Sequence, residues 1–313
     1  MRRSLAVVSA SVLLVSSLAG CGGDGPADPE VEVSGGFGAV PAVEFPKGGA
    51  PGEAFALETV VEGDGKVVAD GDLVVADYVG YTWAQGGTSK LIGNSFQGGT
   101  PAAFPSWNLV PGLKRALVGA KAGSRVVAVI PPKDGYGDKG SDRLGIAADD
   151  ALVYVLDVRA TFPKGASVED APAFAEGAGL PEVAAGDVPG IKVPKAAPPK
   201  KLTVETVKTG PGPEVKGGDL LAIQYVGALW RDGKVFSSSW TDGKVYAAVI
   251  GQQQVIKGWD EALVGKKVGS RLLVVAPPDM AYGAKDMAVK GLPKYGIKES
   301  DTLVYVIDVL GAF

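Results

Sequence analysis

Val255-Ile256-Lys257-Gly258-Trp259 is the stretch that decides how the last third of this chain folds. An apolar pair is followed by a basic residue, a glycine and a tryptophan, and a short helical pattern begins directly behind them. Strand-forming segments flank the stretch on both sides, which predicts a helix enclosed by strands. A tryptophan at a loop-to-helix junction can lie flat against a sheet. Trp259 is therefore either a packing residue or the floor of a binding site.

The rest of the chain repeats itself with a period of about 147 residues, which indicates tandem domains rather than a solenoid. In the first copy, Leu109-Val110-Pro111-Gly112-Leu113 stands where the second has Val255 to Trp259. Other motifs recur in the same order, including Gly71-Asp72-Leu73 with Gly218-Asp219-Leu220, Tyr78-Val79-Gly80 with Tyr225-Val226-Gly227, and Gly123-Ser124-Arg125 with Gly269-Ser270-Arg271.

Each copy contains the same predicted elements, four strands and one short helix. The predicted strands are Phe55–Val61, Leu73–Tyr81, Arg125–Ile130 and Ala151–Val158 in the first copy, and Leu202–Val207, Leu220–Leu229, Arg271–Ala276 and Thr302–Leu310 in the second. The predicted helices are Leu113–Val118 and Trp259–Val264, each followed by a glycine, Gly119 or Gly265, which favours a helix C-terminus. The absence of βαβ alternation predicts an α+β fold, with an antiparallel sheet wrapped over the helix in each domain.

The first 20 residues have the pattern of a secretory signal peptide, because two arginines precede an apolar run from Leu5 to Leu18. Leu18-Ala19-Gly20-Cys21 resembles the lipobox of bacterial lipoproteins. That resemblance implies cleavage before Cys21, lipid on its sulfur and anchoring to the outside of the bacterial cell membrane. The alternative is an ordinary signal peptide with an incidental cysteine.

Two segments rich in glycine, proline, alanine and acidic residues separate these parts. Residues 21–40 are predicted to be a flexible tether, and residues 164–190 a semi-extended linker. The predicted domains are therefore residues 41–163 and residues 191–313.

The composition excludes much familiar catalytic chemistry. None of the 313 residues is histidine and only one is cysteine, which removes histidine-based triads, internal disulfides and multi-cysteine zinc sites. A net charge of −4 argues against nucleic acid as a partner. With 46% hydrophobic residues the chain can build real cores. The exclusions leave apolar shape, hydrogen bonds and carboxylates as its means of chemistry.

Several spaced motifs of the second copy together carry a family resemblance. They are Tyr225-Val226-Gly227, Asp232 to Ser239, Gly251, Val255 to Asp260, Pro278 to Gly283 and Thr302 to Tyr305. In this order and spacing the second copy resembles the FKBP-type peptidyl-prolyl cis-trans isomerase domain. The resemblance implies a half-barrel of antiparallel strands over a helix, an aromatic-lined pocket between them and no cofactor. It also implies proline-containing polypeptides as substrates and macrolides such as tacrolimus or rapamycin as ligands. We expect a monomer.

The resemblance also implies a role for each matching site residue. Trp259 forms the floor, the Ile256 N–H and the Tyr282 hydroxyl bind substrate carbonyls, and the remaining walls and rim are Tyr225, Phe236, Tyr246, Val255, Ile297 and Tyr305. The family usually has an acid directly after the wall phenylalanine, where this chain has Ser237. We therefore expect an active but sub-maximal isomerase. Asp260 and Glu261 stand in the first helical turn, where carboxylates offset the helix dipole.

The same positions have drifted in the first copy. They are occupied by Tyr78, Ile92, Leu109, Val110, Leu113, Tyr136, Ile146 and Tyr154, with Gly93 at the position of Ser237 and Ala102 roughly at that of Tyr246. The first domain is therefore predicted to be a weak isomerase, or a domain that only binds or only spaces. Its other aromatic residues could partly refill the site, namely Trp83, Phe96, Phe104 and Trp107.

Two functions remain open from the sequence. The first is a lipid-anchored isomerase that assists the folding of exported proteins, mainly through its second domain. The second is a proline-peptide-binding or chaperone lipoprotein with little turnover. A solute-binding lipoprotein is disfavoured because no two-lobed α/β pattern is present. In either case, Leu180-Pro181 or Leu292-Pro293 of the chain itself could occupy the pocket.

Overall fold

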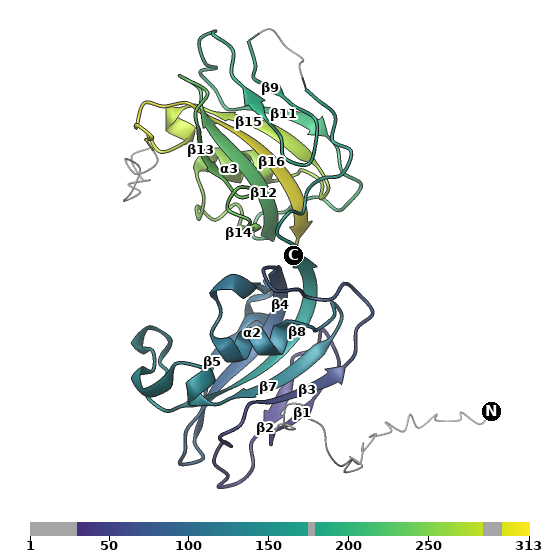
Figure 1. The fold of residues 1–313 in the computed structure, drawn as a ribbon, viewed down its shortest axis with the longest axis vertical. Helices are drawn as coiled ribbons and strands as arrows, with labels where there is room; N and C mark the ends of the chain where they lie inside the picture. The colour runs from purple at the N-terminus through teal and green to yellow at the C-terminus, as the bar shows by residue number, and fades with distance from the viewer. Residues whose placement is uncertain (1–29, 175–178, 284–295) are drawn as a thin grey trace, which may run out of the picture.

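The computed structural model describes residues 30–174, 179–283 and 296–313, which form two domains built around two six-stranded antiparallel sheets (Figure 1). The first sheet has the order β3-β7-β8-β4-β5, with β6 pairing β4 as well. Its strands are β3 Ala56–Val61, β4 Leu73–Trp83, β5 Ser89–Asn94, β6 Ala102–Pro105, β7 Arg125–Ile130 and β8 Ala151–Phe162.

The second sheet repeats this arrangement strand for strand. Its order is β11-β15-β16-β12-β13, with β14 pairing β12. Its strands are β11 Thr203–Lys208, β12 Leu220–Leu229, β13 Val235–Ser238, β14 Tyr246–Val249, β15 Arg271–Ala276 and β16 Leu303–Ala312. The predicted α+β fold with two tandem domains is thereby confirmed.

One short helix lies across the inner face of each sheet: α2 Pro111–Leu117 in the first domain and α3 Lys257–Leu263 in the second. Both begin two residues earlier than predicted and carry a glycine as their second residue. In α2 the first residue is Pro111, which is compatible with the first helical turn. A Cβ on Gly112 would lie 2.2 Å from Ile130 Cγ2, and one on Gly258 would lie 2.9 Å from the Met280 carbonyl oxygen. Glycine therefore allows each helix to begin in close contact with its surroundings.

The remaining helical turns are short. They are α1 Ser95–Gly98, η1 Ser106–Asn108, η2 Pro132–Asp134, η3 Gly137–Lys139, η4 Asp142–Leu144 and η5 Pro278–Met280. Gly119 and Gly265, predicted just beyond the two main helices, have φ angles of 94° and 79°. These left-handed conformations explain the glycines. No helix among the described residues is long and apolar enough to cross a membrane.

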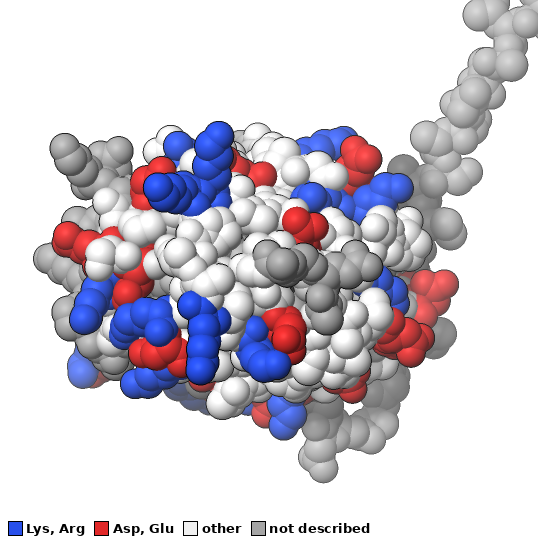
Figure 2. All heavy atoms as spheres, turned by 90° about the horizontal axis from the view of Figure 1, so that it is seen from above, with Lys and Arg blue, Asp and Glu red and all other residues white. Residues whose placement is uncertain are grey.

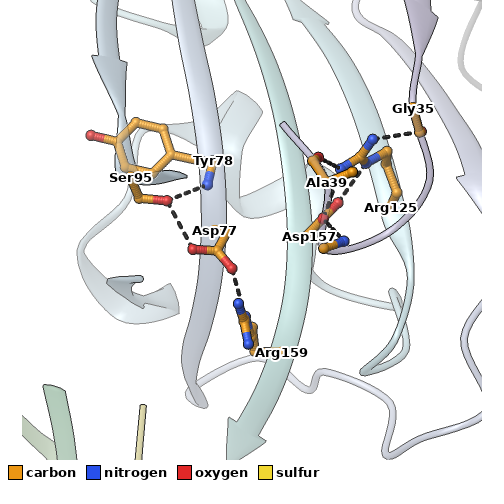
Figure 3. A network of polar contacts seen from close by, with 9 residues as sticks. Gly35, Ala39, Asp77, Tyr78, Ser95, Arg125, Asp157 and Arg159 are labelled. Atoms are coloured by element: carbon orange, nitrogen blue, oxygen red, sulfur yellow. Dashed lines mark hydrogen bonds and ion pairs between the residues drawn. The ribbon is translucent and has the colours of Figure 1, made fainter. Parts of the chain in front are cut away.

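Part of the predicted tether belongs to the first domain. Residues 32–34 form β1 (Glu32–Ser34), which pairs with β2 (Ala42–Glu44), and Val31 is buried against the outer face of the sheet. The loop between these strands is held by Arg125, whose Nη1 and Nη2 donate to the carbonyls of Gly35 and Ala39 at 2.6 Å each (Figure 3). Arg125 also pairs with Asp157, and both side chains are fully buried. The buried guanidinium needs these acceptors, so the loop is ordered despite its tether-like composition.

The predicted linker packs on the second domain in the same way. Residues 182–183 form β9 (Glu182–Val183), which pairs with β10 (Ile191–Lys192). The buried Arg271 pairs with Asp308 and donates to the carbonyls of Gly186 at 2.7 Å and Asp187 at 3.3 Å. We refer to residues 31–44 as the strap of the first domain, and to residues 168–174 and 179–192 together as the strap of the second. Each strap covers the sheet face opposite the helix.

The position of the second strap shows whether Leu180-Pro181 can occupy the chain's own pocket. Leu180-Pro181 leads directly into β9, and Val183 of that strand packs against Val304 and Val306 on the outer face. The dipeptide therefore lies on the wrong side of the sheet to occupy a site beside α3. Leu292-Pro293, the signal peptide and Cys21 lie outside the described residues.

The two domains meet through the ends of their long strands (Figure 1). Leu73, Ala222 and Val245 form a small buried cluster between them, against which Trp107, Phe162 and Leu310 pack among others. The rings of Phe162 and Phe313 contact edge to face, with centroids 6.0 Å apart. The closing strands β8 and β16 thus run further than predicted, because their last residues build this contact.

Candidate functional site

The site of the second domain is organised by Trp259, which lies in the first turn of α3 and is only 5% exposed. Its indole packs edge-on against Tyr225 and Tyr305, with ring centroids 5.1 Å away in both cases. Tyr246 lies 6.1 Å from Trp259, and Phe236 lies 5.8 Å from Tyr305. We call these five residues the aromatic cluster. Its rings come from β12, β13, β14, β16 and α3, so the sheet and the helix must both form before the cluster exists.

The cluster is surrounded by apolar residues and contains few polar partners. Val255, Ile256 and Ile297 are buried in the same core as Trp259, and Tyr282 packs against it. The Nε1 of Trp259 is buried and has no hydrogen-bond partner among the described residues. The structure therefore brings together every residue that the sequence assigned to this site, while their catalytic roles remain predictions.

Burial also changes the acidity of the tyrosines. It raises the pKa of Tyr305 well above its ordinary value of about 10, and the neighbouring Tyr282 and Tyr225 add to this shift. Burial raises the pKa of Tyr246 as well. For Tyr225 burial raises the pKa, and the hydrogen bond with Ser237 partly offsets the shift. These hydroxyls consequently stay neutral at physiological pH and act as hydrogen-bonding groups rather than charges.

Ser237 takes part in the site through Tyr225. Its Oγ lies 2.9 Å from the Tyr225 hydroxyl, and either atom can donate. The backbone of Tyr225 is fixed separately, since its N–H donates to Ser239 Oγ at 2.8 Å. The serine thus supplies an uncharged partner for the wall tyrosine.

Asp260 has a structural role that the sequence did not reveal. Its carboxylate accepts hydrogen bonds from the N–H groups of Gly251 at 2.7 Å and Gln253 at 2.8 Å. It therefore closes the loop that leads into Val255 and Ile256, which goes beyond the expected offset of the helix dipole. Ile256 is the residue immediately before the helix, and its N–H donates to no backbone acceptor in the described part of the chain. This N–H is the donor that the sequence assigned to a substrate carbonyl.

The first domain builds the same framework with different side chains. Leu113 occupies the helical position of Trp259, and it is buried together with Phe104, Ile146 and Tyr154. Tyr78 corresponds to Tyr225, and its N–H likewise donates to a serine, Ser95, at 2.9 Å (Figure 3). The other predicted positions pack against this core, namely Ile92, Leu109, Val110 and Tyr136.

Strand register explains how the first domain lost its aromatic wall. Ala102 pairs with Ala76 just as Tyr246 pairs with Ile223, so Ala102 is the counterpart of Tyr246. Two residues further along the same strand, Phe104 stands where the second domain has Ala248. The Phe104 ring contacts the Tyr78 ring edge to face, with centroids 5.5 Å apart, and helps to fill the core that also contains Leu113.

Four further aromatic residues were expected to fill the site of the first domain. Within the part of the chain that the structure describes, Phe104 is the one of these four that lies in the core beside α2. Trp83 is buried on the opposite face of the sheet, with its Nε1 donating to the Gly49 carbonyl at 3.2 Å. Trp107 packs at the interface between the domains. Phe96 is in α1 and is half-buried. The sequence could not separate these cases, because it does not show which face of the sheet each ring reaches.

Comparison with known proteins agrees with the two-domain geometry. The family model described as FKBP-type peptidyl-prolyl cis-trans isomerase matches twice, over residues 65–159 and 212–310. An FK506-binding protein from Streptomyces anulatus is 32% identical over 122 residues, covering 39% of this chain and 94% of that protein.

Larger relatives match over part of their length. The human peptidyl-prolyl cis-trans isomerase FKBP10 is 28% identical over 227 residues, covering 70% of this chain and 31% of the human protein. Among solved structures, FkpA from Escherichia coli has 29% sequence identity and a TM-score of 0.32, covering 38% of this chain and 53% of that one. The two family matches span more than half of the residues and include both helix-centred sites. The chain therefore belongs to the FKBP-type peptidyl-prolyl cis-trans isomerase family.

Proposed function

We propose that the second domain catalyses cis–trans isomerisation of X–Pro peptide bonds in unfolded or proline-containing exported polypeptides. We also propose that lipid on Cys21 holds the chain at the outer face of the bacterial cytoplasmic membrane. The aromatic cluster around Trp259 is the observation that carries the catalytic part. The pattern of residues 1–21 supports the location.

The reaction suits a site of this composition. Rotation about the peptide bond meets a barrier of about 18–20 kcal/mol, because the C–N bond has partial double-bond character. The cis and trans forms of X–Pro differ by only about 0.5–1 kcal/mol but interconvert over tens of seconds or more. Catalysis therefore needs neither a nucleophile nor a proton shuttle. It requires surroundings that favour the twisted amide over the planar one.

The aromatic cluster provides such surroundings. The planar amide is more dipolar than the twisted amide, so water stabilises it more strongly. A proline ring placed against the indole of Trp259, between Tyr225, Phe236 and Tyr305, exchanges that water for apolar ring surface. The Ile256 N–H and the Tyr282 hydroxyl can each donate to a carbonyl flanking the reacting bond. Such bonds would hold the ends of the peptide while its centre rotates.

Binding of proline-containing segments with little or no turnover is the second candidate, and Ser237 is the observation that favours it. The residue has no charge and is paired with the Tyr225 hydroxyl at 2.9 Å, where the family usually has an acid. In this version the cluster binds proline segments, as a chaperone would, but accelerates rotation little. Macrolides such as tacrolimus would compete for the same surface in both versions.

Nucleic acid is not among the proposed partners. The net charge is −4, and the face in Figure 2 shows lysine and arginine interspersed with aspartate and glutamate rather than gathered into one basic surface.

Exchange spectroscopy by NMR on a short Leu-Pro peptide tests the catalytic proposal with the full chain. We expect the cis–trans exchange rate to rise in proportion to the protein concentration and to fall when tacrolimus is added. Peptide resonances that shift without faster exchange would favour the binding-only candidate. If neither exchange nor chemical shifts change, both candidates are wrong.

The membrane location has a separate test. In a bacterial host that processes lipoproteins, the wild-type chain should fractionate with membranes and incorporate labelled palmitate. Cys21→Ser should do neither. A Cys21→Ser protein that still carries label or remains with the membranes in the same amount would refute anchoring through this residue.

A further inference from the structure

A groove of about 340 Å³ lies between the two domains, beside the aromatic cluster. Its walls include Leu73, Pro105 and Trp107 from the first domain and Tyr225, Lys244 and Tyr246 from the second. β14, which carries Tyr246, lies at the end of the second domain that faces the first (Figure 1). Neither domain alone contains the complete groove.

The groove is continuous with the proposed catalytic site, because two residues belong to both. Tyr225 and Tyr246 contact Trp259 at 5.1 and 6.1 Å, and they also line the groove. Tyr246 is 40% exposed, although the neighbouring Tyr305 and Trp259 are almost completely buried. The groove therefore begins one ring away from the indole on which the proline would rest.

Trp107 follows a turn that both domains build, since Ile250 of the second domain donates its N–H to the Asp219 carbonyl at 3.1 Å and accepts from the Gly218 N–H at 2.7 Å, but only the first domain carries a tryptophan there. Trp107 lies in η1, where the preceding Ser106 donates its N–H to the Asp72 carbonyl at 3.0 Å and accepts from the Gly71 N–H at 2.8 Å. The corresponding position, two residues beyond β14, is Gly251. The first domain has thus lost aromatic rings from its own site and carries one at the border of its neighbour's site.

The chemistry of the walls indicates the occupant. Aromatic and aliphatic carbon dominates, and the polar side chains of the lining, apart from the aromatic ones, are Ser239, Asp242 and Lys244. The Lys244 Nζ stands 5.9 Å from the centroid of the Trp107 ring. Such walls suit a large apolar side chain on an extended backbone, with the ammonium near enough for a backbone carbonyl. An extended polypeptide advances by about 3.3 Å per residue, so two to four residues beyond the proline would reach the groove.

We propose that the groove binds the substrate polypeptide itself, through a large apolar side chain two to four residues from the isomerised proline. The first domain then acts as the docking half of a composite site through Trp107. This proposal rests on the isomerase function proposed for the second domain, because the chain that enters the groove is the substrate held at Trp259.

Peptides of different reach test the proposal with the full chain. The short substrate is a blocked Leu-Pro dipeptide, which cannot extend into the groove. The long substrates are two twelve-residue peptides that contain the same Leu-Pro. One has a phenylalanine three residues before the Leu-Pro, and the other has it three residues after. We expect Trp107→Ala to lower kcat/KM by about fivefold on at least one long peptide, the size expected for loss of one aromatic contact, and to leave the dipeptide unchanged. Trp107→Phe should restore most of the loss.

Leu91→Ala is the matched control, since Leu91 is an exposed apolar residue of the same domain that is not among the groove-lining residues. It should affect neither substrate. Equal kcat/KM of wild type and Trp107→Ala on both long peptides would overturn the proposal, as would an equal loss on the dipeptide. If the wild type does not turn over the dipeptide, the proposed function fails instead, and the two failures are distinguishable.

A direct readout is independent of rates. Benzoylphenylalanine replaces the distal phenylalanine of the long peptide, and the complex is irradiated and digested with trypsin. We expect a cross-link in the first-domain peptide that spans residues 91–114, lost on competition with the unlabelled peptide. Cross-links confined to residues of the second domain would overturn the docking role of the first.

Discussion

The two domains share one framework but differ in what fills it. In the second, Trp259 begins the helix and four further rings gather around it from the sheet. In the first, Leu113 takes the tryptophan position and Phe104 packs under Tyr78. The helix, the glycine in its first turn and the strand order are alike in both. The comparison shows that the fold does not need the tryptophan, so the tryptophan is free to serve function.

The two cores also carry an aromatic residue at different positions of the equivalent strand, Phe104 in the first domain and Tyr246 in the second. Phe104 lies two positions from the counterpart of Tyr246 on the same strand, so both point to the same side of the sheet. A ring at either position can fill volume over the helix. The two arrangements differ in how much of this ring is accessible, since Tyr246 is 40% exposed and Phe104 is 8% exposed.

Removing the straps, which both domains have, is expected to have the largest effect, a loss of stability to unfolding. A fragment of residues 191–313 lacks the carbonyls of Gly186 and Asp187 that accept from the buried Arg271, whereas a fragment of residues 164–313 keeps them. Unfolding in urea should show the shorter fragment to be less stable by about 3 kcal/mol or more, because buried donors lose their acceptors. First-domain fragments beginning at residues 30 and 41 should differ in the same direction, since Arg125 depends on Gly35 and Ala39. Equal urea midpoints within each pair would show that the straps do not stabilise the domains.

Copying the first domain's residue into the second is expected to have the next largest effect. Trp259→Leu should lower kcat/KM on a Leu-Pro peptide by about thirtyfold, or ~2 kcal/mol, because the proline loses its flat apolar surface. Circular dichroism should show that the fold persists, as the first domain already folds around leucine. Leu113→Ala serves as the control and should leave the exchange rate unchanged, unless the first domain contributes turnover of its own.

The reverse exchange should be unfavourable by itself. Leu113→Trp adds a large ring to a core that Phe104 already fills, and we expect it to destabilise the protein by about 1.5 kcal/mol through overpacking. The double variant Leu113→Trp/Phe104→Ala should recover most of this stability. A double-mutant cycle measured by thermal unfolding checks the coupling. Additive effects of the two substitutions would mean that Phe104 does not occupy the space that the tryptophan needs.

A smaller effect is expected from the loop that precedes the second helix. Asp260→Asn weakens the two hydrogen bonds to Gly251 and Gln253, so the loop that presents Ile256 should become less ordered. We expect kcat/KM to fall about threefold, mainly through KM, because the bonds lose their ionic character. Glu261→Gln is the matched control, as Glu261 is its neighbour in the helix and pairs only with Lys257 at 3.6 Å among the described residues. If Glu261→Gln lowers kcat/KM as much as Asp260→Asn does, the effect comes from losing a negative charge near the start of the helix and not from the hydrogen bonds to Gly251 and Gln253.

The sequence was sufficient for three strands whose side chains are almost all buried. Arg125–Ile130, Arg271–Ala276 and Leu220–Leu229 were predicted with the observed ends, because continuous β-branched and aliphatic runs are typical of central strands. Short edge strands such as β13 and β14 were not predicted, since runs of four residues at a sheet edge carry little hydrophobic pattern. The straps were assigned to a tether and a linker for a similar reason. Their order comes from backbone carbonyls, which any sequence supplies, and from a buried arginine far away in the chain.

The sequence by itself determined the duplication and the fold class, because both follow from spacing and residue type, and the family resemblance of its motifs predicted the site residues. Only the tertiary structure decided which ring lies on which face, that Asp260 closes the loop before Ile256, and that Trp107 borders the site of the other domain. The physical reason is distance along the chain. Patterns within a few residues report local periodicity. They do not report which side chains meet across a loop, as Asp260 and Gly251 do nine residues apart, or across two folded surfaces, as Trp107 and Lys244 do.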